Sequence, residues 1–85
     1  MKELKYVIKD PAGIHARPAG EFIKAVKQFG SNITITKDRK TVDGKRIFGV
    51  MGLAVKQGEE IVIRVEGTDE DAAIAAVEKF LRNNL

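Results

Sequence analysis

The only histidine of the chain, His15, stands two residues before Arg17 and three before Pro18. Neutral imidazole is a nucleophile, and an ordinary histidine populates that form near neutral pH. Pro18 is tolerated in the first turn of a helix, where its missing N–H has no partner to lose. The imidazole and a guanidinium are therefore expected beside a helix N-terminus, whose unpaired amides attract anions. This arrangement suits a histidine that carries a phosphoryl group. By itself, a lone surface histidine is also compatible with no function.

The segments around His15 follow the pattern of a strand, a loop and a helix. Apolar residues alternate over 4–8, the period of a half-buried strand, and Asp-Pro-Ala-Gly at 10–13 ends that strand. Helical spacing follows and predicts a helix that begins at about residues 15–17. Gly30 is expected just past the end of this helix, whose apolar face consists of Phe22, Ile23, Val26 and Phe29.

A hairpin and a short helix are expected next. Isoleucine alternates with threonine over 33–35, and the polar residues 37–40 reverse the chain into a short strand at 41–42. Glycines interrupt the apolar segment 45–55. This irregular pattern favours one or two turns of helix over a strand.

The last part of the chain predicts a strand and a C-terminal helix. After a turn at 57–60, isoleucine and valine alternate over 61–65, and Gly67 ends the strand. Thr68 and Asp71 have the spacing of a capping box, which predicts a helix start there, and Arg82 lies near the helix end. The apolar stripe of this helix consists of Ala73, Ile74, Val77, Phe80 and Leu81.

These elements predict a two-layer α+β fold. Four strands with one apolar face, covered by helices, form an open-faced sandwich whose antiparallel sheet has the element order β-α-β-β-α-β-α. A chain of 85 residues is expected to form one domain, residues 1–85.

Composition restricts the class of protein. Cysteine is absent and histidine occurs once, so we expect no disulfide, no metal site and no cofactor. Residues 1–5 are largely charged, which argues against a signal peptide. The longest apolar stretch, 47–55, is far shorter than the roughly 20 residues that span a bilayer. We therefore expect a cytoplasmic protein without stable membrane association.

Charge is distributed unevenly along the chain. Residues 1–46 hold 11 Lys/Arg and 5 Asp/Glu, a net charge of +6, and residues 47–85 hold 4 and 7, a net charge of −3. If the fold keeps these halves apart, the molecule has a basic face that suits an acidic partner. A solvated surface without a partner is the alternative.

Two segments resemble a known family. Residues 13–20, Gly-Ile-His-Ala-Arg-Pro-Ala-Gly, resemble the active-site signature G-[LI]-H-A-R-P-A of HPr, the histidine-containing phosphocarrier of the bacterial sugar phosphotransferase system. Residues 45–53, Lys-Arg-Ile-Phe-Gly-Val-Met-Gly-Leu, resemble the second, regulatory segment of that family. The element order and the length fit as well, so the resemblance covers the whole chain.

The resemblance implies a phosphoryl relay. His15 would be phosphorylated on Nδ1 by Enzyme I, at the expense of phosphoenolpyruvate, and would pass the group to the A domains of sugar permeases. The backbone amides of Ala16 and Arg17, and the Arg17 side chain, would bind the phosphoryl oxygens. Such a protein is a carrier rather than an enzyme, and we expect a monomer. The implied docking surface is an apolar patch with basic neighbours: Ala16, Gly20, Ile47, Phe48 and Met51, with Lys24 and Lys27.

The docking residues also permit a purely structural interpretation. Ile47, Phe48 and Met51 could pack in the core, and a solvent-facing Phe48 would favour an interface instead. Lys24 and Lys27 could be the solvated face of an amphipathic helix.

One position departs from the family pattern. Many HPr proteins carry a serine after the lysine of the second segment, and an ATP-dependent kinase phosphorylates it in many Gram-positive members, whereas this chain has Arg46. We expect no regulatory phosphate there, and tighter, more salt-sensitive binding to acidic partners. Gly52 removes a second common serine. A paralogue that serves a non-sugar relay, for example a nitrogen-related one or a dihydroxyacetone kinase, is therefore an alternative.

Other classes fit less well. Gly49-Val50-Met51-Gly52 matches the G-x-x-G of KH domains, but its central residues are apolar, so we expect no nucleic-acid partner. Gly44-Lys45 lacks the upstream glycine and the following hydroxyl residue of a P-loop. Regulators that share the HPr fold but lack the histidine are disfavoured by the presence of His15 and Arg17.

Overall fold

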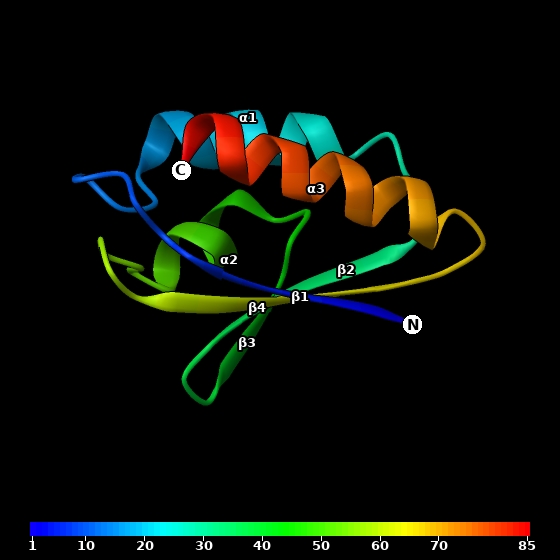
Figure 1. Cartoon of the computed structure of the whole chain (residues 1–85), viewed down its shortest axis with the longest axis horizontal. Helices are drawn as coiled ribbons and strands as arrows, with labels where there is room; N and C mark the ends of the chain where they lie inside the picture. Colours follow the sequence, from blue (N-terminus) through cyan, green and yellow to red (C-terminus); the bar gives the residue numbers. More distant parts are fainter.

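Helices lie on one face only of a four-stranded antiparallel sheet (Figure 1). The computed structural model describes all residues, 1–85. The strands are β1 (Lys2–Val7), β2 (Asn32–Lys37), β3 (Lys40–Asp43) and β4 (Glu60–Glu66), in the spatial order β1-β4-β2-β3. The helices are α1 (Ala16–Val26), α2 (Ile47–Gly52) and α3 (Glu70–Asn84). The predicted element order and the open-faced α+β sandwich are confirmed.

The alternation of residues in the strands makes one face of the sheet the core. Ile61, Ile63 and Val65 of β4 are fully buried. In the sheet, Ile63 lies opposite Leu4 of β1 and Ile35 of β2. A slip of one residue would turn this row toward solvent, so its burial determines the register of the sheet.

Two helices, α1 and α3, pack against each other over this row. Phe22 of α1 and Phe80 of α3 meet edge to face, with ring centroids 5.6 Å apart and an interplanar angle of 68°. The apolar stripe predicted on the C-terminal helix is confirmed, with Ala73, Val77 and Leu81 buried and Ile74 and Phe80 partly buried. The contact between the helices fixes the position of α1, and with it the helix N-terminus next to His15.

The end of α1 differs from the prediction. The helix stops at Val26, and Phe29 lies outside it, although Phe29 still packs against the core. The Phe29 amide donates to the carbonyl of Val26 at 3.1 Å, three residues back, and the amides of Gly30 and Ser31 are bound by the carboxylate of Asp69, at 2.9 and 3.0 Å. Helical spacing alone does not reveal such a competitor.

The capping box predicted at Thr68 is wrong. Asp69 is the N-cap residue of α3, and no side chain caps the helix. The Asp69 carboxylate instead accepts the two amides of Gly30 and Ser31 and the Ser31 hydroxyl. Gly67, at φ +157, permits this close approach, because a Cβ there would lie 2.7 Å from the Cα of Ser31. Asp69 therefore ties the start of α3 to the start of β2.

The loop between β1 and α1 begins beside the end of α3. The amides of Lys9 and Asp10 donate to a main-chain oxygen of Leu85, at 2.6 and 3.0 Å. Asp10 also accepts the amide of Ala12 on its side chain, at 2.8 Å. Figure 1 shows this loop and the C-terminus at the same end of the molecule. The approach to His15 is thus anchored to the opposite end of the chain.

The last residues of the loop rest on the segment between α2 and β4. Ile14 donates its amide to the carbonyl of Val55 at 3.0 Å. Gly13 has a φ of +68, and a Cβ there would overlap that carbonyl and lie 2.9 Å from the Cα of Lys56. Only glycine fits this conformation and this contact without displacing the backbone.

Gly13→Ala is expected to lower the free energy of unfolding by about 2 kcal/mol or more, since it combines an unfavourable φ with overlap against backbone atoms. Denaturant unfolding measures the effect. Gly52→Ala is the control, because nothing lies within 4 Å of its Cβ position. We expect that variant to stay within about 1 kcal/mol of the parent. Equal stabilities for the two variants would show that the Gly13 contact does not constrain the loop.

Asp69→Asn is expected to make the Tm of the protein less dependent on pH under acidic conditions. Hydrogen bonds, first from the Ser31 hydroxyl and then from the Gly30 amide, lower the pKa of Asp69 from its ordinary value of 3.8. A carboxyl group whose pKa is lowered by folding stabilises the native state at pH values above its ordinary pKa. This stabilisation is lost as the pH falls through the folded-state pKa. Asp69→Asn should therefore reduce Tm at neutral pH and reduce the further drop in Tm below about pH 4.

The control for this measurement is Asp71→Asn, which removes an equal charge from an exposed position of α3 that pairs with Lys2 at 3.2 Å. In this control, the change of Tm with pH under acidic conditions should stay close to that of the parent. If Asp69→Asn gives the same slope as Asp71→Asn, the carboxylate does not tie the two elements together as described.

Candidate functional site

His15 is the N-cap residue of α1. Its backbone is extended, with φ −114 and ψ −176, and its carbonyl accepts the Ala19 amide at 3.0 Å. The residue is half-buried, and its imidazole makes no capping hydrogen bond. The helix start predicted at residues 15–17 is confirmed. The imidazole therefore lies at the N-terminus of the helix without capping its free amides.

The amides that follow His15 have no helical partners. Ala16 and Arg17 are the first residues of α1, so no preceding turn offers them a carbonyl, and Pro18 has no N–H. The first turn also contains no acidic side chain. The partial positive charge of this helix end is thus uncompensated, which favours an anion beside His15.

One face of α1 connects this end of the helix with α2. Ala16, Gly20, Lys24 and Lys27 follow one another at spacings of three or four residues and so lie on the same side. A Cβ on Gly20 would lie 3.8 Å from Cδ1 of Ile47 in α2. The absence of a side chain at Gly20 therefore leaves α2 close to the row of residues that begins next to His15.

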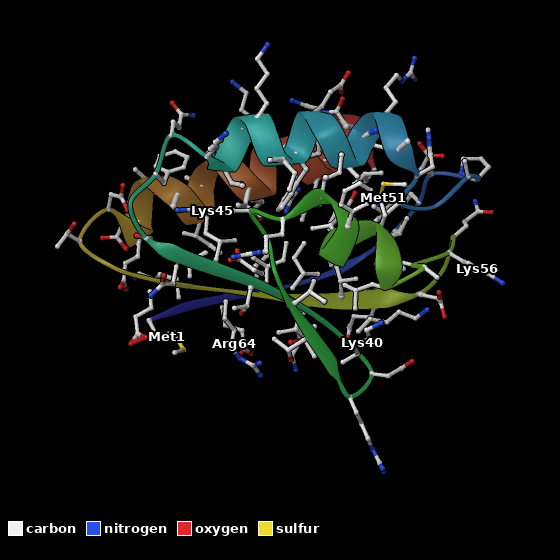
Figure 2. All side chains as sticks on the ribbon, turned by 180° about the vertical axis from the view of Figure 1, so that it is seen from behind. Met1, Lys40, Lys45, Met51, Lys56 and Arg64 are labelled. Carbon is white, nitrogen blue, oxygen red and sulfur yellow. The ribbon has the colours of Figure 1, made fainter.

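Helix α2 presents the most exposed aromatic residue of the molecule. Phe48 is 86% exposed, whereas Ile47 and Met51 are partly buried against the core. Figure 2 shows Met51 between α2 and the first turns of α1. The alternative that all three residues pack in the core is wrong for Phe48. Its exposed ring is the kind of apolar feature that marks an interface.

The residues that precede α2 carry two positive charges. Arg46 is its N-cap residue, its side chain is 82% exposed, and its Nε lies 3.7 Å from a carboxylate oxygen of Asp43. Lys45 (Figure 2) points to the end of α1, where Nζ donates to the carbonyl of Phe29 at 2.6 Å. Lys45 therefore joins α2 to the turn after α1, and sequence reasoning assigned it no such role.

The fold does not keep the basic and acidic halves of the chain apart. Strand β1 lies next to β4, and four ion pairs join the two halves: Met1–Glu70, Lys2–Asp71, Lys37–Glu59 and Glu3–Arg64. The cations on α1 take no part in this pairing, since Arg17, Lys24 and Lys27 are exposed and make no ion pair. The exposed side of α1 therefore carries positive charge that no carboxylate of the chain neutralises through an ion pair.

The G-x-x-G pattern has a different structural context from the KH motif that it matches. The G-x-x-G residues 49–52 lie in helix α2 with Val50 buried, whereas a KH motif requires a loop that faces the nucleic acid.

No group of three or more His, Cys, Asp or Glu side chains is close enough to hold a metal ion. None of the helices is long and apolar enough to cross a bilayer.

Comparison with known proteins agrees with this geometry. The family described as "PTS HPr component phosphorylation site" matches residues 2–83. The phosphocarrier protein HPr of Lysinibacillus sphaericus is 43% identical over 81 residues, which is 95% of this chain and 92% of that protein. The structure of the histidine-containing phosphocarrier protein of Mycoplasma superposes with a TM-score of 0.94 at 39% identity and covers 96% of this chain and 93% of its own. HPr-C-His from Thermoanaerobacter tengcongensis gives a TM-score of 0.93 at 41% identity, covering 98% and 93%. A full-length sequence match and the same fold, around a histidine at a helix N-terminus, place this chain in the HPr family of phosphocarrier proteins of the phosphotransferase system.

Proposed function

We propose that His15 accepts a phosphoryl group from phosphorylated Enzyme I and donates it to the A domains of sugar permeases. The observation that carries this proposal is the position of the imidazole at the N-cap of α1, beside the unpaired amides of Ala16 and Arg17. Membership of the HPr family supports the identity of the two partners.

The chemistry is an exchange of one bond to phosphorus for another. The lone pair of Nδ1 of His15 attacks phosphorus, and the bond between phosphorus and the donor group of Enzyme I breaks. The phosphoryl oxygens then accept hydrogen bonds from the amides of Ala16 and Arg17 and from the Arg17 guanidinium. These bonds stabilise the negative charge of the oxygens. Transfer to a permease domain repeats the exchange in the other direction, so His15 is regenerated. The chain therefore acts as a carrier rather than as an enzyme.

The docking surface consists of Phe48 with Ile47 and Met51, the Ala16 and Gly20 positions, and the neighbouring cations Lys24 and Lys27. The exposure of Phe48 and the absence of ion pairs on α1 support this assignment. An apolar centre with a basic rim fits an acidic partner surface that surrounds an apolar pocket. We propose that the whole chain acts as one domain and as a monomer in the cytoplasm, without nucleic-acid partners.

Arg46 gives this surface a charge where many HPr proteins have a hydroxyl. Its guanidinium is exposed and pairs only with Asp43, at 3.7 Å. The position cannot be phosphorylated as a serine is, so regulation by a serine kinase is absent there. The same residue favours a second candidate, a paralogue that serves a non-sugar relay, because an added cation changes which acidic partners bind.

His15→Ala is expected to abolish phosphorylation by phosphoenolpyruvate and Enzyme I, because no other side chain of the chain is an imidazole. Intact-mass measurement should find one added phosphoryl group on the parent protein, and acid should remove it. Arg17→Ala retains the acceptor and should still be phosphorylated, about tenfold more slowly, since one charge-assisted contact is lost. An acid-stable adduct, or one that persists in His15→Ala, contradicts the proposal.

Phe48→Ala is expected to weaken binding to Enzyme I by about tenfold or more, because a central aromatic contributes much of an interface's binding energy. Its folding stability should change by less than about 0.5 kcal/mol, since the ring packs against little. Titration calorimetry and denaturant unfolding measure the two effects. Val7→Ala is the matched control, being 45% exposed on the uncovered face of the sheet. Equal affinities for the two variants would remove Phe48 from the docking surface.

A further inference from the structure

The loop that leads to His15 is bound at its start by Leu85, and it also rests on the segment Leu53–Glu59, which connects α2 with β4. Beyond the bond from Ile14 to Val55, the amide of Gly58 donates to the carbonyl of Ile8 at 2.8 Å. The Gln57 side chain donates to the carbonyl of Lys9 at 3.1 Å. The conformation of segment 53–59 therefore contributes to the position of the residues just before His15.

This segment contains an unfavourable backbone conformation. Ala54 has a φ of +51, in the left-handed region that side chains with a Cβ avoid. Its neighbours Leu53 and Val55 are both buried, 4% and 2% exposed. The turn at Ala54 places both side chains in the core and aims the Val55 carbonyl at Ile14. A strained turn of this kind persists only where surrounding contacts hold it.

Lys37 provides such contacts. Its Nζ donates to the carbonyls of Leu53 and Ala54, at 3.2 and 3.1 Å, on either side of the strained turn. It also lies 3.0 Å from Oε1 of Glu59 at the other end of the segment. The same oxygen accepts the amide of Lys56 at 2.7 Å. The Lys37 side chain is only 17% exposed, so these interactions are partly shielded from water.

We propose that Lys37 is a positioning residue for phosphoryl transfer at His15, acting by holding segment 53–59 in the conformation that supports the loop. The role rests on the proposed function, and it involves no contact between Lys37 and the reacting atoms. Without the ammonium group, the turn at Ala54 relaxes and the Val55 carbonyl moves away from Ile14. The imidazole then spends less time in the geometry that transfer requires.

A second lysine of the same hairpin offers a matched control. Lys40 (labelled in Figure 2) donates to the carbonyl of Gly52 at 3.3 Å and makes no bond to segment 53–59. Lys37→Met and Lys40→Met each remove one positive charge from the hairpin and keep most of the aliphatic stem. Their difference therefore isolates the contacts to segment 53–59 from the general effect of charge.

The experiment compares phosphorylation kinetics with Enzyme I and amide hydrogen exchange in the parent and the two variants. For Lys37→Met we expect kcat to fall by about threefold or more with KM within about twofold, because docking is unchanged and orientation is lost. The Ile14 amide should exchange about tenfold faster, while the amides of the central strand β4 keep their protection. Lys40→Met should match the parent in kcat and in Ile14 exchange.

A rescue variant separates positioning from simple destabilisation. Glycine adopts a φ of +51 without strain, so Lys37→Met combined with Ala54→Gly should regain Ile14 protection and most of kcat. The inference is overturned if Lys37→Met behaves as Lys40→Met does, if β4 loses protection together with Ile14, or if glycine restores nothing. A parent protein that takes no phosphoryl group from Enzyme I overturns the proposed function itself, which is a different result from any of these.

Discussion

The main constraint on this molecule is that the amides at the start of α1 stay without a side-chain cap. A side-chain N-cap from Ser, Thr, Asp or Asn typically stabilises a helix by about 1 kcal/mol, and α1 does without one. His15 occupies the capping position and leaves the amides of Ala16 and Arg17 available. Under the proposed function, the helix forgoes intrinsic stability so that an anion can bind where a cap would otherwise lie.

The stability that α1 lacks at its N-terminus comes from packing. Phe22 and Val26 are buried against α3 and the sheet, so the helix is held by its apolar face rather than by its ends. The other two helices follow the same pattern, since neither Arg46 nor Asp69 caps its own helix. Asp69 instead joins the start of α3 to the start of β2 through Gly30 and Ser31. The N-cap residue of α3 thus serves a tertiary contact, and under the proposed function that of α1 serves an anion-binding site.

Charge pairing sorts the cations of the molecule into two groups. Lys2, Lys37 and Arg64 of the sheet pair with carboxylates from the other half of the chain. Arg17, Lys24 and Lys27 of α1 remain exposed and unpaired, and α1 adjoins α2, the helix that carries the exposed Phe48. An exposed apolar side chain and uncompensated positive charge on neighbouring helices form a surface that an acidic partner can bind.

The sequence by itself determined most of the elements, the fold class and the family, and it supplied His15 as the proposed chemical centre. The alternation in β4, the helical spacing after Pro18 and the motif around His15 are local patterns, and local patterns are what periodicity and backbone preferences report. Only the tertiary structure decided that Phe48 faces solvent, that Asp69 binds Gly30 and Ser31 instead of capping its helix, and that segment 53–59 supports the His15 loop. Each of these depends on contacts between residues far apart in the chain, and no spacing along the sequence records which carbonyl or carboxylate will compete for a given amide.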